Sequence, residues 1–206
     1  MRIQAAKRLL TVKMVYYGPG LGGKTTNLAC LHERFPSTQR GEMLQLDTDT
    51  ERTLFFDYFP MVLGRIGGYR VKVDFFTVPG QSFYHATRRA VLEGADGIAF
   101  IADSSPSREE ANVVSREDLV ANLAALGKNL DDIPHVYQWN KRDARNALPV
   151  GVMAAILNPE GAPSAPAIAI RNRGVWETHR LLLGKVFDKL RESTGVSTKP
   201  AEARVG

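Results

Sequence analysis

Cysteine is nearly missing from this chain of 206 residues, which has a single one, Cys30. One cysteine cannot form an internal disulfide, and such scarcity is typical of proteins that fold in a reducing cytosol. The four histidines are scattered and lack the spacing of metal ligands. No hydrophobic run approaches the roughly 20 residues of a membrane span. The sequence therefore predicts a cytoplasmic protein with no integral membrane segment, disulfide scaffold or histidine metal centre.

A strong excess of one charge is missing as well. The chain has 27 Lys and Arg residues against 22 Asp and Glu residues, a formal net charge of +5, and the basic residues are dispersed. Nucleic-acid binding needs a basic face with aromatic or helical readers, and the sequence contains none. We therefore expect no nucleic-acid partner. With 44% hydrophobic residues, the chain has enough apolar side chains for one sizeable core.

The chain does contain a complete phosphate-binding loop, Gly18-Pro-Gly-Leu-Gly-Gly-Lys-Thr25. A buried strand is predicted directly before it and a helix directly after it, as the pattern G-x-x-x-x-G-K-[ST] requires. Glycines let the backbone approach a phosphate chain, and the loop N–H groups then point at it. Lys24 is expected to reach the β- and γ-phosphates, and the Thr25 hydroxyl to bind Mg²⁺. The residues expected to contact nucleotide here are Gly18, Gly20, Leu21, Gly22, Gly23, Lys24, Thr25 and Thr26.

A second motif, Asn140-Lys-Arg-Asp143, follows another predicted strand and indicates which base is bound. There the Asp143 carboxylate would accept both N1–H and the exocyclic N2 amine of guanine. Adenine lacks this pair of donors, and sites of this kind reject such an analogue by about 10⁴–10⁵. Asn140 is expected to support the base loop, and the stem of Lys141 to lie along the ring. Together the two motifs predict a guanine nucleotide site.

Predicted strands and helices alternate along the chain. The strands are expected at 11–17, 53–63, 69–78, 97–103, 135–140 and 165–170, and the helices at 25–35, 83–93, 108–126, 149–157 and 175–192. This alternation predicts an α/β fold, with a mostly parallel six-stranded sheet and helices on both faces. The short glycine-rich segment 64–68 joins the second and third strands, which predicts an antiparallel hairpin at the edge of the sheet.

Four stretches of the chain resemble the Ras-like small GTPases, and specifically their MglA-type bacterial branch. These stretches are Tyr16-Tyr-Gly-Pro-Gly-Leu-Gly-Gly-Lys-Thr-Thr-Asn27, Arg52-Thr-Leu-Phe-Phe-Asp57, Thr77-Val-Pro-Gly-Gln81 and Gln138-Trp-Asn-Lys-Arg-Asp143. The resemblance extends over nearly the whole chain. It implies a P-loop small GTPase fold, with a Ras-like GTPase domain over residues 1–193. The remaining residues 194–206 are expected to form a disordered tail, because the chain from Ser193 onward is rich in Thr, Pro and Ala.

The resemblance also implies roles in the two switch segments. Thr53 would meet both Mg²⁺ and the γ-phosphate, and would be released when the γ-phosphate leaves. Gln81 would orient the attacking water, and Arg52 would be an arginine finger supplied in cis. The expected catalytic residues are thus Arg52, Thr53, Gln81 and Lys24, the metal ligands are Thr25 and Thr53, and further nucleotide contacts come from Gly80 and from the backbone N–H of Ala169, facing guanine O6.

Thr77 departs from the usual Ras-like pattern, in which an aspartate opens this element and supports Mg²⁺ through water. A neutral hydroxyl holds the surroundings of a metal more weakly than a carboxylate does. The sequence therefore predicts a modest affinity for Mg²⁺. Around Ala169, the serine and lysine of the usual Ser-Ala-Lys element are also absent, so that only the backbone N–H is left to contact the base.

The resemblance implies a GTP-dependent switch with slow intrinsic hydrolysis, acting in cell polarity or gliding motility. Its activator would be a roadblock-fold homodimer of the MglB type, and partners would recruit the protein to the cell poles or the membrane. Two other functions stay open. One is a GTP-dependent scaffold with negligible hydrolysis, against which the presence of Gln81 argues. The other is a phosphate-loop kinase or ATPase, against which the motif at 140–143 argues.

Overall fold

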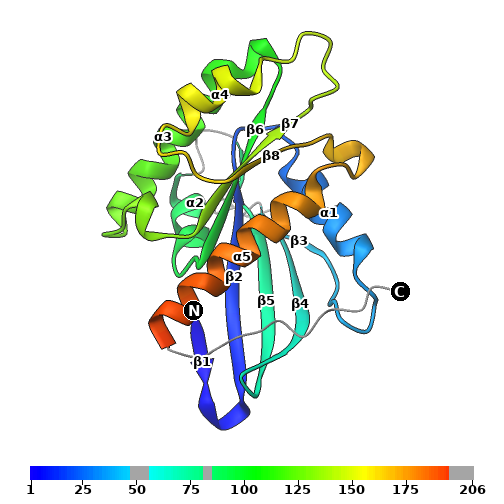
Figure 1. Cartoon of the computed structure of the whole chain (residues 1–206), viewed down its shortest axis with the longest axis vertical. Helices are drawn as coiled ribbons and strands as arrows, with labels where there is room; N and C mark the ends of the chain where they lie inside the picture. Colours follow the sequence, from blue (N-terminus) through cyan, green and yellow to red (C-terminus); the bar gives the residue numbers. More distant parts are fainter. Residues whose placement is uncertain (47–55, 81–84, 195–206) are drawn as a thin grey trace.

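The structure is a computed structural model that describes residues 1–46, 56–80 and 85–194. A twisted sheet forms its centre, with helices on either side (Figure 1). The strands are β1 (Arg2–Gln4), β2 (Leu9–Tyr17), β3 (Leu44–Leu46), β4 (Phe56–Ile66), β5 (Tyr69–Thr77), β6 (Gly97–Asp103), β7 (His135–Asn140) and β8 (Ser164–Pro166). The helices are α1 (Lys24–Arg34), α2 (His85–Leu92), α3 (Glu109–Ala125), α4 (Val150–Leu157) and α5 (Val175–Thr194).

The strand order is β3-β4-β5-β2-β6-β7-β8, with β1 paired to β2. The five strands from β5 to β8 in this order run parallel, whereas β1, β3 and β4 pair antiparallel with their neighbours. This confirms the predicted α/β fold with a mostly parallel sheet. The predicted number of six strands was wrong, since the described residues form an 8-stranded sheet. The hairpin of β4 and β5 is also not at the edge, because β3 lies outside it.

The last predicted strand is shorter than expected. β8 ends at Pro166, and a 3₁₀ turn over Ala169–Arg171 replaces the rest of the predicted strand. Pro166 has no N–H to give to a ladder. The turn instead brings the N–H of Ala169 to the side chain of Asn140, at 2.9 Å. After β8 the chain thus leaves the sheet, and its next turn packs against the base motif through Asn140.

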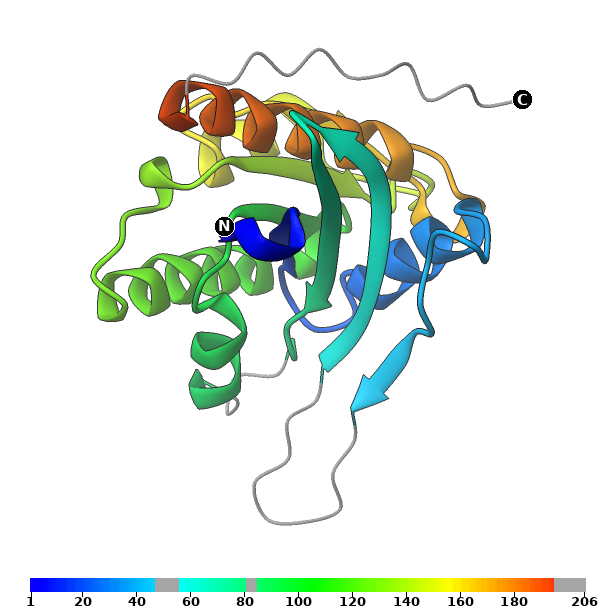
Figure 2. The same cartoon turned by 90° about the horizontal axis from the view of Figure 1, so that it is seen from below.

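Two hydrophobic cores lie on the two faces of the sheet. Under α1 and α5, side chains such as Leu28 and Leu182 pack on β2, β4 and β5. Under α2, α3 and α4, side chains such as Leu92 and Leu123 pack on β6 and β7. Figure 2 shows α5 and α3 on opposite sides of the sheet. Among the described helices, none is both long and apolar enough to cross a membrane.

The carboxyl ends of β2, β6 and β7 bring the sequence motifs together. β2 ends at Tyr17, directly before the phosphate loop, and β7 ends at Asn140, the first residue of the base motif. Asp103, the last residue of β6, is in register with Asn140. In open α/β sheets, ligands bind outside the carboxyl ends of the strands. The fold therefore places the candidate site at this edge.

Candidate nucleotide-binding site

The phosphate loop has a backbone shape that only glycine adopts without strain. Gly18 has φ 140° and Gly23 has φ 98°. A Cβ atom on Gly18 would lie 2.3 Å from the carbonyl oxygen of Ile101, and one on Gly23 would lie 2.3 Å from Nδ2 of Asn140. Both positions therefore require glycine for two independent reasons, conformation and space. The loop is packed directly on β6 and on the base motif.

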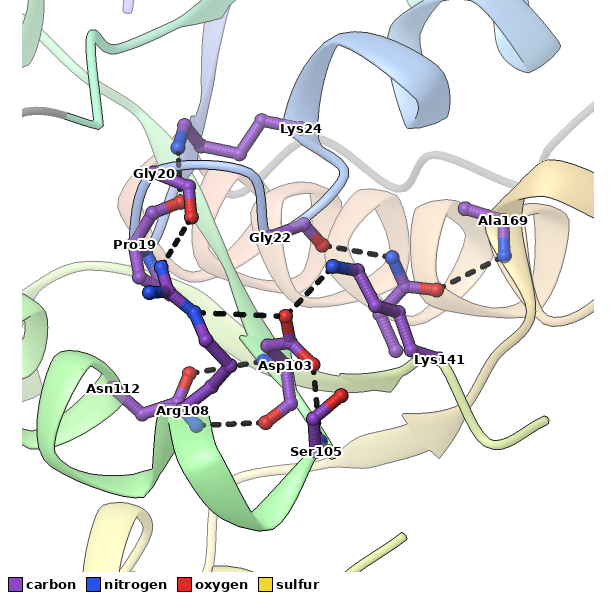
Figure 3. Close-up of polar contacts among 11 residues, drawn as sticks. Pro19, Gly20, Gly22, Lys24, Asp103, Ser105, Arg108, Asn112, Lys141 and Ala169 are labelled. Carbon is purple, nitrogen blue, oxygen red and sulfur yellow. Dashed lines mark hydrogen bonds and ion pairs between the residues drawn. The ribbon is translucent and has the colours of Figure 1, made fainter. Parts of the chain in front are cut away.

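Lys24 is held by the phosphate loop itself (Figure 3). Its Nζ donates to the carbonyl oxygens of Gly18, at 2.8 Å, and Pro19, at 2.7 Å. An ammonium group has three N–H donors, so one is left for a phosphate oxygen. The side chain is buried, and this burial lowers the pKa of Lys24 to about 7, while the nearby carboxylate of Asp57 opposes the shift. A bound phosphate chain would favour the charged form again.

Nucleotide binding is therefore expected to take up a proton above pH 7. At pH 8 to 8.5 most free protein would hold Lys24 neutral, and binding of GDP would recharge it, with an uptake close to one proton per nucleotide. The pKa of Lys24 is low in the free protein and higher in the GDP complex. The affinity for GDP is therefore highest below about pH 7, and above that pH it falls by up to about tenfold per pH unit. Calorimetry in buffers of different ionisation enthalpy measures this uptake.

The variant Lys24→Arg provides the control for this experiment, because a guanidinium stays charged in proteins. It is expected to bind GDP more weakly but without proton uptake. Wild-type binding with no uptake at pH 8.5 would contradict the lowered pKa of Lys24.

On the metal side of the site, the structure supplies a carboxylate that the sequence did not single out. The Asp57 carboxylate accepts hydrogen bonds from the hydroxyls of Thr25, at 2.6 Å, and Thr77, at 2.8 Å. The backbone N–H of Asp57 donates back to the Thr77 hydroxyl at 2.8 Å. Asp57 is only 7% exposed. A carboxylate thus lies beside Thr77 after all, contributed by the neighbouring strand β4.

A signal for Asp57 does exist in the sequence. Side chains alternate between the two faces of a strand, and Asp57 shares the buried face of β4 with Phe59 and Met61. An aspartate at an inward position is rarely left unpaired. Its partner, however, lies twenty residues away on β5, and only the register of the hairpin shows which residue that is.

The chemistry of these groups fits Mg²⁺. This ion is usually held by one or two carboxylates together with phosphates and waters. Across the described ranges no group of three or more His, Cys, Asp or Glu residues is arranged to hold a metal by itself. A hydroxyl, Thr25, and one carboxylate, Asp57, next to a phosphate loop match an ion that is completed by its nucleotide.

The structure brings the residues that were predicted to contact the base to one cavity. A cavity of about 300 Å³ is lined by Leu21, Gly23, Thr26, Asn140, Lys141, Asp143, Ala144, Ile168, Ala169 and Ile170. A second cavity of about 540 Å³ is lined by Gly20, Leu21, Gly23, Lys24, Thr25, Thr26, Gln45, Phe56, Asp57, Thr77, Val78, Pro79 and Gly80. The two cavities share Leu21, Gly23 and Thr26, so together they form one trough. Several lining residues were not among the predicted contacts: Gln45, Phe56, Asp57, Thr77, Val78, Pro79, Ala144, Ile168 and Ile170.

Asn140 joins the phosphate loop to the 3₁₀ turn at Ala169–Arg171. Its Nδ2 donates to the carbonyl of Gly22 at 2.8 Å, and its Oδ1 accepts the N–H of Ala169 at 2.9 Å. That N–H was expected to face guanine O6. In the structure the Ala169 N–H donates to Asn140 Oδ1 instead, so its contact with guanine O6 stays a prediction. That contact would require the N–H to donate to both oxygens or to reorient toward O6.

Three of the predicted catalytic residues, Arg52, Thr53 and Gln81, lie outside the described residues. The described chain nevertheless reaches the phosphate cavity on both sides of the first segment, because Gln45 and Phe56 both line it. Gly80, the residue directly before Gln81, lines it as well. The roles of all three residues stay predictions.

Comparison with known proteins identifies the family. No protein-family model matches the chain. The chain is 43% identical over 190 residues to the mutual gliding-motility protein MglA of Myxococcus xanthus, and this match covers 92% of the chain and 97% of that protein. A match of this length includes both the phosphate loop and the base motif. This chain belongs to the MglA-type bacterial small GTPases.

Proposed function

We propose that this protein is a GTP-dependent molecular switch that hydrolyses GTP slowly with Mg²⁺. The observation that carries the proposal is the single trough in which the cavity at Lys24 and the cavity at Asp143 meet. A ligand filling this trough needs a phosphate chain at one end and a planar base with adjacent donors at the other. A guanine nucleotide has both.

For the metal, Thr25 and Thr53 would be protein ligands, and Asp57 would support the site through Thr25 and Thr77. Bound Mg²⁺ would neutralise charge on the phosphate oxygens. The two hydrogen bonds at Asp57 Oδ2 support this assignment, because they aim one buried negative charge at the predicted ligand Thr25. The aspartate that is missing at position 77 would thus be replaced from β4, and the expected modest affinity for Mg²⁺ no longer follows.

Asp57→Asn is expected to lower the affinity of the GDP complex for Mg²⁺ about 10–100-fold. Asparagine keeps the shape and still accepts from Thr25 and Thr77, so the loss reports the charge. Release of a fluorescent GDP analogue, followed over a Mg²⁺ titration, gives the midpoint for metal binding without any hydrolysis. Asp74→Asn is a matched control on the same hairpin, since Asp74 pairs with Lys72 at 2.9 Å. Equal midpoints for the two variants would contradict the role of Asp57.

For catalysis, Gln81 would orient the attacking water and Arg52 would stabilise the charge at the γ-phosphate. A roadblock-fold homodimer of the MglB type would act as the activating partner by placing these two residues. By analogy with the named function of the Myxococcus relative, we place the switch in gliding motility or cell polarity. The protein would be cytoplasmic and reach the cell poles or the membrane through partners.

Two measurements on the purified full chain test the proposal. The chain is purified without added nucleotide and denatured, and the released ligand is identified by chromatography; GDP or GTP near one per chain is expected. Release of phosphate from GTP is then followed with and without the activating partner. An empty or adenine-loaded protein would overturn the guanine assignment. Bound GTP with no phosphate release in either condition would favour a scaffold over a GTPase.

A further inference from the structure

A buried carboxylate, Asp103, lies between the phosphate loop and the base loop (Figure 3). It is 1% exposed, at the end of β6. Its Oδ1 accepts the backbone N–H of Ser105 at 3.0 Å. The side chain of Asn112, on α3, accepts the N–H of Asp103 at 2.9 Å and donates to its carbonyl at 2.8 Å. The backbone of Asp103 is therefore tied to α3, and its carboxylate to the backbone of Ser105 just beyond β6.

Two cations meet at the other oxygen of this carboxylate. Lys141 Nζ lies 2.7 Å from Asp103 Oδ2, and Arg108 Nε lies 3.9 Å from the same oxygen. Removing the partner of a buried charge is costly because the charge left behind is uncompensated. The three groups therefore hold one another, although they come from β6, from the 3₁₀ turn Pro106–Arg108 before α3, and from the base motif.

Arg108 extends this cluster to the phosphate loop. Its Nη2 donates to the carbonyl oxygen of Gly20 at 2.6 Å. Gly20 is in turn packed against Gly80, where an added Cβ would lie 2.3 Å from the Gly20 Cα. Arg108 thus holds the part of the phosphate loop that touches the start of the second switch segment.

Lys141 extends the cluster to the base loop. It has φ 61°, a left-handed conformation that is unusual for a residue other than glycine. The contact with Asp103 anchors its side chain in this conformation, and Asp143 follows only two residues later. Lys141 and Asp143 line the base cavity, whereas Arg108 and Asp103 do not.

We propose that Asp103 and Arg108 are positioning residues that couple the phosphate loop to recognition of the base, through Lys141. This inference rests on the proposed binding of guanine nucleotides and adds to it the residues that set its specificity. Arg108 lies outside the base cavity. A purely structural role would therefore weaken binding of every base alike, whereas the proposed coupling weakens mainly the recognition of the N2 amine of guanine.

The test compares the affinities for GDP and inosine diphosphate, which differ by the N2 amine that Asp143 would bind. In Arg108→Met, which keeps the aliphatic stem, the ratio of the two affinities is expected to fall about tenfold from the wild-type value. The matched control is Arg116→Met on α3, the helix that directly follows Arg108; this change removes the 3.0 Å ion pair with Glu160 away from the site. Calorimetric titration gives the affinities, and thermal unfolding shows how far each variant is destabilised.

A double-variant cycle separates the coupling from direct contact of Lys141 with the base. Because Arg108→Met and Lys141→Met interrupt the same connection, the double variant is expected to show the ratio of Lys141→Met alone. If Arg108→Met lowers both affinities equally, as a merely structural loss would, the coupling is refuted. If the wild-type chain itself does not prefer GDP over inosine diphosphate, the proposed guanine site fails instead, so the two failures are distinct.

Discussion

Asp143→Asn is expected to weaken GDP binding by about 10³-fold or more, and to make the chain bind xanthosine diphosphate instead. A site that matches a donor pair discriminates strongly, because its acceptors stay unpaired when any other ligand covers them. Asparagine replaces one acceptor with an N–H₂ donor, which faces the N2 amine of guanine but matches the O2 oxygen of xanthine. The phosphate loop is untouched, so a nucleotide with the altered base should bind well.

Competition of a fluorescent GDP analogue with GDP, xanthosine diphosphate and ADP measures this switch. Arg171→Gln is the control, because Arg171 lies 3.9 Å from Asp143 but is 64% exposed at its side chain. An exposed pair of this kind contributes little, so the preference for GDP should stay unchanged. If Asp143→Asn retained the wild-type preference, the base would be read elsewhere.

The central fold is predictable because its elements are long and bury whole faces. β6 is buried at every residue, and its sequence is apolar from Gly97 to Ala102, as is usual for a parallel strand covered on both sides. β1 and β3 have three residues each, too few to show a period. They become strands only because β2 and β4 offer free hydrogen-bonding edges, which is a tertiary property. The error in the number of strands therefore falls on the shortest elements.

The candidate site likewise contains parts that the sequence predicts and parts that it does not. The phosphate loop and the base motif are recognisable in the sequence because short local patterns encode their backbone shape and chemistry. Asp57 and Asp103 escaped prediction, since the role of each depends on contacts with distant residues. Asp57 acquires its role where β4 meets β5, and Asp103 where two loops and α3 converge. An aspartate at a buried strand position does indicate a polar or charged partner. The sequence alone does not show which residue that partner is, because the neighbouring strand is not known.

The Thr77 hydroxyl donates to the Asp57 carboxylate and accepts from the Asp57 N–H. In the proposed metal site, this pair would take the place of the single aspartate that is usual at position 77. Because Asp57 lies only four residues after Thr53, its strand connects the metal side of the site to the first switch segment. A partner that repositions β4 would thereby move both groups together.

Arg52→Ala is expected to lower partner-stimulated GTP hydrolysis about 10³-fold or more, with GTP binding unchanged. Arg52 is close enough in the chain to act on the γ-phosphate. Leu46 and Phe56 are paired across the sheet, and Phe56 lines the phosphate cavity. Arg52 is four residues from Phe56 in the sequence, and four residues of extended chain span at most about 14 Å.

Single-turnover hydrolysis with saturating activator isolates this effect from binding. Gln81→Leu is expected to give a comparable loss, because the attacking water is no longer oriented. Arg65→Ala is the control: Arg65 is an exposed arginine near the opposite end of β4, and its loss should leave the rate within about twofold, as for most surface changes. Undiminished turnover in Arg52→Ala would mean that the arginine comes from the partner. The activator would then supply a catalytic group, rather than only placing the two that this chain carries.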